Sequence, residues 1–322
     1  MHRHLAESTL QSSTTRDQEG RVADFARVGE TVIRIIPRLD IKGPNLVKGI
    51  HLEGLRVLGK PEVFARHYYE QGADELFYQD AVASLYERNG LLDIVERTSR
   101  EIFIPLCVGG GLRSVEDIRN TLRAGADKVA VNTAAIRRPQ LIREAAEAFG
   151  SSTIVIAIEA IRQPDGRYEC FVDCGREATG VDAFDWARKV EELGAGEIVL
   201  TSVDREGTGK GYDLELTRRI AASVSIPVIA HGGAGIASHV GDVVEKAGAD
   251  AVCLASLLHY TAVAELHDAG ADFGAEGNVE FLKRGTGFGK IGRARIDDVK
   301  REVAVRGFEC REDVFAVATT PS

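Results

Sequence analysis

The chain has 322 residues, 44% of them hydrophobic, and a formal net charge of −9 at pH 7. This length suits a single α/β barrel of about 250 residues with extensions. The acidic balance argues against non-specific binding to nucleic acid, which needs a basic face. The sequence has neither an apolar run long enough to span a membrane nor a signal peptide, so we expect no membrane association and a cytoplasmic location.

The first 30 residues are polar and are predicted to form a flexible tail. Eight short apolar runs follow, and most are apolar throughout rather than alternating, as in parallel strands that are buried on both faces. These runs span residues 31–40, 74–80, 104–110, 127–133, 153–159, 197–204, 226–233 and 250–256.

Helical patterns separate the apolar runs. Residues 61–72 begin with Pro61 and end at Gly72, and residues 114–125 open on Ser114 with Asp117 three positions later, which resembles a capping box. Similar patterns cover residues 137–150, 182–194, 213–224 and 237–248. The alternation predicts a (β/α)8 TIM barrel formed by residues 31–322 as a single domain.

The alternative fold is an open doubly wound sheet, which usually carries a GxGxxG turn after its first strand. Here the first strand runs into "LDIKGPNLVKG", which is not such a turn. Residues 261–295 precede the last predicted helix, at 295–305, and they lack helical periodicity. We expect them to form a loop or lid over the active face, or a docking surface for a third protein.

An internal repeat divides the barrel into halves. "IPLCVGGGLRS" at 104–114 returns as "IPVIAHGGAGIAS" at 226–238, and "GADELFYQD" at 72–80 returns as "GAGEIVLTSVD" at 194–204. The strand that ends at Asp40 has its counterpart in the strand that ends at Glu159. Two half-barrels of four βα units would place equivalent glycine clusters on opposite sides of one barrel mouth. A substrate with a phosphate at each end would match this pair.

Functional residues of this fold lie at the carboxyl ends of its strands. Glycines there let backbone N–H groups approach an oxyanion, although one such cluster alone could simply make a tight turn. Two symmetric clusters, each followed by a small polar strand end, favour phosphate sites. The predicted sites comprise Gly110, Gly111, Asn132 and Thr133 in one half, and Gly232, Gly233, Ala255 and Ser256 in the other.

Asp40 and Glu159 are candidate catalytic residues, because two carboxylates that face each other suit general acid–base chemistry. Either carboxylate alone could instead pair with a lysine such as Lys42 or Lys48. Lys48 could contact a phosphate or could be a solvated loop residue, and the sequence leaves both possibilities open. Asp80 and Asp204 form a second duplicated acidic pair.

The five cysteines do not predict a metal site or a disulfide framework. Cys107 and Cys253 lie in apolar runs and are expected in the core, whereas Cys170 and Cys174 form a CxxxC without a second ligand pair nearby. We therefore expect neither a metal nor a cofactor.

Residues 32–260 closely resemble the cyclase subunit of imidazole glycerol phosphate synthase. The resemblance rests on motifs such as "RIIPRLDIK", "VGGGLRSVEDIR", "LRAGADKVAVNTAA", "LTSVDREGTGKGYDLEL" and "PVIAHGGAG". It implies a barrel that takes ammonia from a partner glutaminase in a heterodimer. The expected reaction closes the imidazole ring on a bis-phosphorylated ribulosyl substrate and releases an aminoimidazole ribotide.

The resemblance also implies residue roles. Asp40 matches the catalytic aspartate of the first strand, Lys48 a substrate-contacting lysine, and Glu159 the place of a second catalytic aspartate. One phosphate site of the family matches Gly111, Asn132 and Thr133, and the other matches Gly207, Gly233, Ala255 and Ser256. Thr201 is a further candidate for binding the substrate. A ring of charges at the ammonia entrance matches Arg34, Glu75, Lys128 and Glu197, although such a ring could also be a plug that only stabilises the barrel floor.

Four positions depart from the family pattern. Glu159 and Glu206 replace aspartates, Arg38 replaces a cysteine, and His231 replaces a serine. With "EGNVEFLK" at 276–283, these changes resemble a paralogue group found with bacterial surface-polysaccharide genes. That likeness leaves two alternatives to the cyclase: a paralogue with weak or no cyclase activity that delivers ammonia for amidination of a sugar, and a non-catalytic activator of a glutaminase.

Overall fold

The computed structural model describes residues 32–82, 91–268 and 291–311. Eight parallel strands form a closed barrel, because β10 pairs with β7 on one side and the order β10-β11-β12-β1-β4-β5-β6-β7 completes the circle. These strands are β1 (Arg34–Lys42), β4 (Leu76–Asp80), β5 (Leu106–Gly109), β6 (Lys128–Val131), β7 (Ile154–Arg162), β10 (Glu197–Ser202), β11 (Val228–His231) and β12 (Ala251–Leu254). The predicted TIM barrel is confirmed, and the predicted tail at 1–30 lies outside the described residues.

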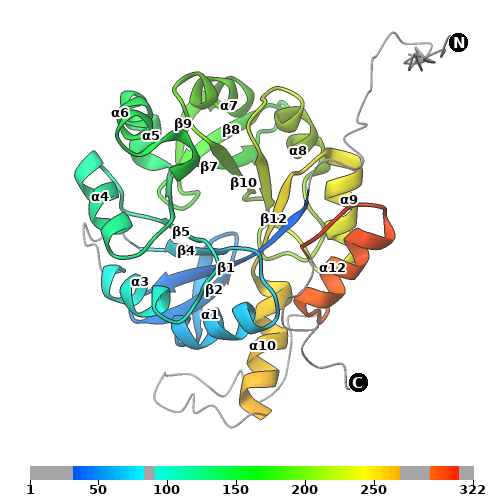
Figure 1. Cartoon of the computed structure of the whole chain (residues 1–322). Coiled ribbons are helices and arrows are strands. Elements are labelled where there is room, and N and C mark those ends of the chain that lie inside the picture. Colours follow the sequence, from blue (N-terminus) through cyan, green and yellow to red (C-terminus); the bar gives the residue numbers. More distant parts are fainter. Residues whose placement is uncertain (1–31, 83–90, 269–290, 312–322) are drawn as a thin grey trace, which may run out of the picture.

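Helices surround the barrel (Figure 1). They are α1 (Pro61–Glu70), α3 (Leu92–Ser99), α4 (Val115–Arg123), α5 (Thr133–Arg137), α6 (Gln140–Phe149), α7 (Ala183–Glu192), α8 (Leu214–Ala221), α9 (Ser238–Ala247), α10 (Ser256–Asp268) and α12 (Ile296–Val305), with the 3-10 turn η1 (Ser151–Thr153) before β7. The predicted cap of α4 is confirmed, since Ser114 Oγ accepts a hydrogen bond from the Asp117 N–H at 3.1 Å. Within the described residues, none of these helices has the length and apolarity to cross a bilayer.

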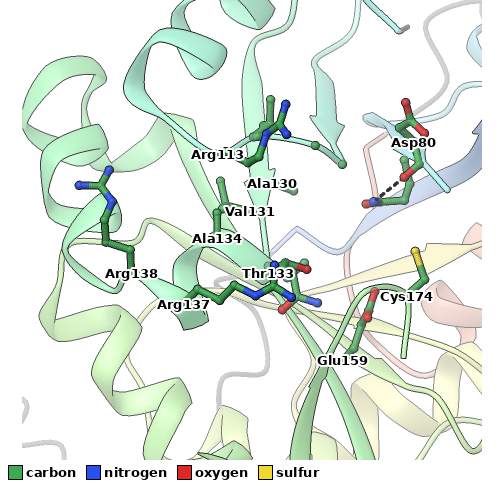
Figure 2. A pocket seen from close by; sticks show the side chains of 16 residues that line it. Asp80, Arg113, Ala130, Val131, Thr133, Ala134, Arg137, Arg138, Glu159 and Cys174 are labelled. Carbon is green, nitrogen blue, oxygen red and sulfur yellow. Dashed lines mark hydrogen bonds between the residues drawn. The ribbon is translucent and has the colours of Figure 1, made fainter. Parts of the chain in front are cut away.

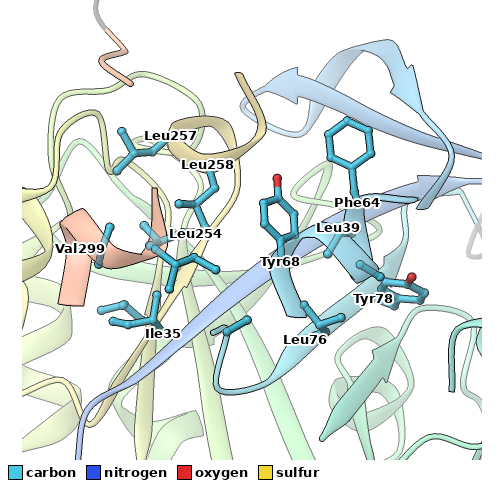
Figure 3. Packing of buried hydrophobic residues seen from close by; sticks show 14 of the residues in the cluster. Ile35, Leu39, Phe64, Tyr68, Leu76, Tyr78, Leu254, Leu257, Leu258 and Val299 are labelled. Carbon is cyan, nitrogen blue, oxygen red and sulfur yellow. The ribbon is translucent and has the colours of Figure 1, made fainter. Parts of the chain in front are cut away.

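Successive residues of each strand face opposite sides of the sheet, and both sides are buried. Ile35 and Leu39 of β1 point outward into a core shared with α1, α10 and α12 (Figure 3). Ile36 lies between them in sequence and points into the barrel, in an apolar interior layer. That layer comprises Ile36, Phe77, Cys107, Ala130, Val155, Val199, Ile229, Ala251 and Cys253. Burial on both faces explains why the strands are continuously apolar, and it confirms Cys107 and Cys253 as core residues.

Two β-hairpins that the sequence analysis does not anticipate extend the barrel mouth. β2 (Asn45–Ile50) and β3 (Glu53–Gly59) follow β1, and β8 (Tyr168–Val172) and β9 (Glu177–Asp182) follow β7. Each hairpin pairs antiparallel with the end of the preceding barrel strand, at Asp40 in the first half and at Glu159 in the second. The hairpins therefore belong to the repeat, and each one covers a candidate carboxylate.

The loop predicted at 261–295 is wrong at its beginning. Residues 261–268 continue helix α10, because Ala262 and Val263 are buried against the outer core. Thr261 Oγ1 accepts a hydrogen bond from the Ala294 N–H at 3.0 Å, which joins the far end of the predicted insertion to this helix. Residues 269–290 lie outside the described residues, so the lid or docking role of this segment stays a prediction.

Asp74 joins the carboxyl-terminal helix to the barrel floor. Its carboxylate accepts the Ile35 N–H at 2.8 Å, lies 3.0 Å from Lys300 Nζ of α12, and lies 3.2 Å from Arg311 Nε. The Asp74 side chain is only 4% exposed and that of Lys300 12%. Removing one partner from a buried pair leaves an uncompensated charge, so we expect Asp74→Ala to lower the free energy of unfolding by about 3 kcal/mol.

Urea unfolding followed by circular dichroism measures this loss. The control is Glu116→Ala, which removes the exposed pair with Arg119 on α4 and should cost less than about 1 kcal/mol. Equal losses in the two variants would contradict the assigned role of Asp74.

Candidate functional site

Asp40 and Glu159 meet at the barrel mouth. Both line one small cavity together with Arg38, Lys48 and Cys174, and both carboxylates are buried, at 4% and 7% exposed. They come from β1 and β7, the equivalent strands of the two halves. The structure therefore brings together the two carboxylates that the sequence analysis selected.

The two carboxylates have opposite electrostatic environments. Burial alone would raise the pKa of Asp40, but the charges of Arg38 and Lys48 outweigh it, and the pKa lies below its ordinary value. Arg38 Nε lies 2.9 Å from Asp40 Oδ1, and Lys48 Nζ lies 3.9 Å from Oδ2. Asp40 is consequently ionised over the whole neutral range.

Burial raises the pKa of Glu159 to about 7, against the attraction of Arg38 and a hydrogen bond from the Gly175 N–H at 2.9 Å. Gly175 belongs to the turn of the β8–β9 hairpin, so this hairpin orients the carboxylate. Two titratable groups whose environments separate their pKa values are suited to act as an acid and a base. The lowered pKa of Asp40 fits a base and the raised pKa of Glu159 fits an acid.

Arg38 points into the barrel, as its position two residues before Asp40 requires. It is 3% exposed, and its guanidinium carbon lies 5.5 Å from the centre of the Phe77 ring in the apolar layer. Besides Asp40, its Nη1 contacts Nδ1 of His231 at 3.3 Å. The sequence analysis identified Arg38 and His231 as departures from the family pattern but could not show that they touch.

Lys48 is buried, so its interpretation as a solvated loop lysine is wrong. Its Nζ forms a short ion pair with Glu206, which follows β10 and is 1% exposed. Glu206 Oε2 also accepts the Leu52 N–H at 2.9 Å. These contacts fasten the β2–β3 hairpin to the loop after β10. Lys42, the other lysine considered for Asp40, is exposed.

A cavity of about 360 Å³ lies beside Glu159 and is lined by the first predicted phosphate site: Gly110, Gly111, Asn132 and Thr133. The sequence analysis missed three arginines at its rim: Arg113, Arg137 and Arg138. Figure 2 shows Arg137 reaching toward Thr133, with Glu159 and Cys174 on the other side. Arg137 Nη2 also lies 3.0 Å from both Asp173 and Glu177 of the second hairpin. Guanidinium groups suit phosphate recognition. The adjacent arginines at the end of α5, Arg137 and Arg138, were the sequence signal that could have identified this rim.

The second predicted phosphate site lines a much smaller cavity, of about 20 Å³. Its walls include Gly207, Gly232, Gly233, Ala255 and Ser256, with Glu206 and His231 beside them. A Cβ at Gly232 would lie 2.7 Å from the Ser202 carbonyl oxygen, and one at Gly233 would lie 2.2 Å from that of Gly211, so the backbone also requires these glycines. A cavity of this size holds about one water.

The four predicted gate residues form a closed ring of ion pairs at the floor. Arg34 lies 2.8 Å from Glu75 and 3.0 Å from Glu197, and Lys128 lies 2.9 Å and 3.0 Å from the same two acids. Burial raises the pKa of Glu75 despite both cations. Every second residue of a strand faces the barrel interior, so the apolar interior layer lies directly above this ring. Arg38 and the two carboxylates lie above that layer.

Cys174 lines both the large cavity and the cavity between the carboxylates. Burial and the charge of Glu159 raise the pKa of its thiol to about 12, so it is a poor nucleophile at neutral pH. Among the described residues, no three His, Cys, Asp or Glu side chains are grouped to hold a metal ion.

A family described as "Histidine biosynthesis protein" matches residues 34–264, which include all eight barrel strands. The chain belongs to this family. A relative named "Imidazole glycerol phosphate synthase subunit HisF" from Legionella pneumophila is 60% identical over 203 residues, which cover 63% of this chain and 96% of the relative.

Other members of the family with the same name are also similar. The protein from Alkaliphilus metalliredigens is 52% identical over 230 residues, covering 71% of this chain and 91% of its own length. The protein from Methanopyrus kandleri is 50% identical over 245 residues, covering 70% and 90%. Each of these three matches covers at least 90% of the relative's own length, so the similarity extends over nearly the whole of each HisF subunit.

Proposed function

We propose that this chain is the cyclase-type subunit of imidazole glycerol phosphate synthase. It uses ammonia from a partner glutaminase to convert a bis-phosphorylated ribulosyl aminoimidazole carboxamide to imidazole glycerol phosphate and aminoimidazole carboxamide ribotide, a step of histidine biosynthesis. One observation carries the proposal: two carboxylates with opposite pKa shifts lie at the mouth of a barrel that is 50–60% identical to proteins of that name. A cytoplasmic location stays a prediction.

The carboxylate pair supplies the proton transfers that the reaction needs. Ring closure forms two C–N bonds to the ammonia nitrogen, which must lose protons. It breaks the C–O bond of the ribulosyl ketone, whose oxygen leaves as water, and one C–N bond to a leaving amine, which must gain a proton. Ionised Asp40 accepts a proton from the ammonia nitrogen, and protonated Glu159 gives one to the leaving amine. The two glycine-lined cavities hold the substrate phosphates on either side of this pair.

Ammonium salt should replace the partner in a direct test. With the bis-phosphorylated substrate and ammonium chloride, the purified chain should form both products in equal amounts, measured by chromatography. A folded chain that forms neither product would contradict the proposal.

The ammonia-delivering paralogue is the second candidate, and one observation favours it. Arg38 places a fixed cation directly on Asp40, which weakens that carboxylate as a base. This candidate predicts little turnover with ammonium salt, although the chain would still stimulate its glutaminase.

The floor ring gives a further prediction about the partner. We expect Lys128→Ala to lower glutamine-dependent turnover at least about tenfold more than ammonium-dependent turnover, because external ammonia does not have to pass the ring. Both assays are run on the complex with the glutaminase. Lys246→Ala, which removes an exposed pair with Asp242 on α9, is the control. Equal losses in both assays would mean that the ring only stabilises the floor.

A further inference from the structure

His231 is a buried histidine at the barrel mouth. It ends β11, is 4% exposed, and lines the small cavity together with Gly232 and Gly233. Its Nδ1 lies 3.3 Å from Arg38 Nη1 and 3.1 Å from Thr201 Oγ1. The proposed chemistry assigns it no role.

The contact with Arg38 determines the tautomer of His231. A guanidinium group can only donate hydrogen bonds and stays charged in proteins, so Nδ1 must accept. Burial and the charges of Arg38 and Lys48 lower the pKa of His231 well below its ordinary value, so the ring is neutral. A neutral imidazole whose Nδ1 accepts carries its proton on Nε2.

The Nε2–H group is therefore a donor available to a ligand. Nδ1 is turned toward Arg38 and Thr201, and among the described residues Nε2 has no hydrogen-bond acceptor. The ring lines a cavity whose other walls are mainly glycine and small side chains. Lys48 lines the neighbouring cavity between the carboxylates and is already paired with Glu206. An N–H donor without a protein acceptor, on a residue that lines this cavity, favours a ligand that accepts hydrogen bonds, such as a phosphate.

We propose that the Nε2–H of His231 donates a hydrogen bond to a phosphate oxygen of the substrate in the small cavity, and that Arg38 positions it by holding the tautomer. This inference rests on the proposed function. The large cavity offers arginines, whereas the small one offers a neutral imidazole and backbone N–H groups. The two ends of a bis-phosphorylated substrate thus meet different donors.

Two variants of similar size separate this role from a structural one. His231→Asn keeps an acceptor near the place of Nδ1 and loses the donor at Nε2, whereas His231→Gln keeps an N–H donor near Nε2. In the ammonium-dependent assay we expect Asn to raise KM about ten- to 100-fold with little change in kcat, as for the loss of a hydrogen bond to a charged group. Gln should stay within about threefold of the native KM. Equal effects of the two variants would overturn the proposal.

The tautomer has its own readout, which does not need turnover. In a chain with ¹⁵N-labelled histidine, the His231 signal, identified by its loss in His231→Asn, should show a protonated Nε2 and an unprotonated Nδ1. Inorganic phosphate should shift this signal. A protonated Nδ1, or no response to phosphate, overturns the proposal. If the native chain shows no turnover, the proposed function fails, and the phosphate titration still decides the role of His231.

Discussion

Replacing Glu159 with glutamine should lower ammonium-dependent kcat/KM by about 10²- to 10⁴-fold, the usual contribution of a general acid or base. Glutamine has nearly the same shape, and its side-chain oxygen can still accept the Gly175 N–H. It cannot give up a proton to the leaving amine. Glu116→Gln, on the exposed face of α4, is the matched control and should keep the native rate.

The pH dependence shows whether Glu159 acts as the acid. Its pKa is raised to about 7, so the protonated form predominates below that pH and is lost above it. The native kcat/KM should be level below about pH 7 and then fall tenfold per pH unit, once rates are expressed per uncharged ammonia. The glutamine variant should lack this fall, while titration of the substrate phosphates is common to both proteins. The same fall in both proteins would contradict the assignment.

Replacing Arg38 with methionine should lower the free energy of unfolding by about 3 to 5 kcal/mol, because it leaves Asp40 buried without its nearest cation. Lys48, at 3.9 Å, is too far away to replace it fully. Asp40 has a lowered folded pKa, so the pair stabilises the protein above the ordinary value of 3.8, and this contribution is lost as the pH falls through the folded pKa. Urea unfolding at pH 7 measures the loss.

A double variant tests whether the loss comes from the ion pair. Arg38→Met combined with Asp40→Asn removes both charges and should be clearly more stable than Arg38→Met alone. If the two single losses simply add, the pair is not coupled, and Arg38 stabilises the barrel through its packing on Phe77 instead.

The barrel could be predicted because its strands are buried on both faces and therefore stand out as apolar runs, as in 153–159 and 226–233. The repeat then placed Asp40 and Glu159 at equivalent strand ends, where the structure has them. The hairpins escaped prediction because polar and charged residues interrupt the apolar positions of their strands, as in "NLVKGI" of β2 and "YECFV" of β8. The pattern of β9, for example, has no fully buried position.

The contacts that distinguish this site could not be predicted from the sequence. Arg38 and His231 come from β1 and β11, which are not neighbours in the barrel, and no spacing along the chain predicts that they touch. The burial of Lys48 depends on the hairpin that carries it, and on Glu206 from the other half of the chain. Such pairs follow from the closure of the barrel rather than from any local pattern.

The most direct test compares the native chain with Glu159→Asp in the ammonium-dependent assay. Aspartate is one methylene shorter, so its carboxylate would withdraw from the Gly175 N–H, and a misplacement of about 1 Å can cost roughly 100-fold. If Glu159 is a working catalytic acid of a cyclase, the native chain turns over the bis-phosphorylated substrate and Glu159→Asp is slower. A native chain that is inactive or slow, with a gain of at least about tenfold in Glu159→Asp, would contradict the cyclase function and favour the ammonia-delivering paralogue.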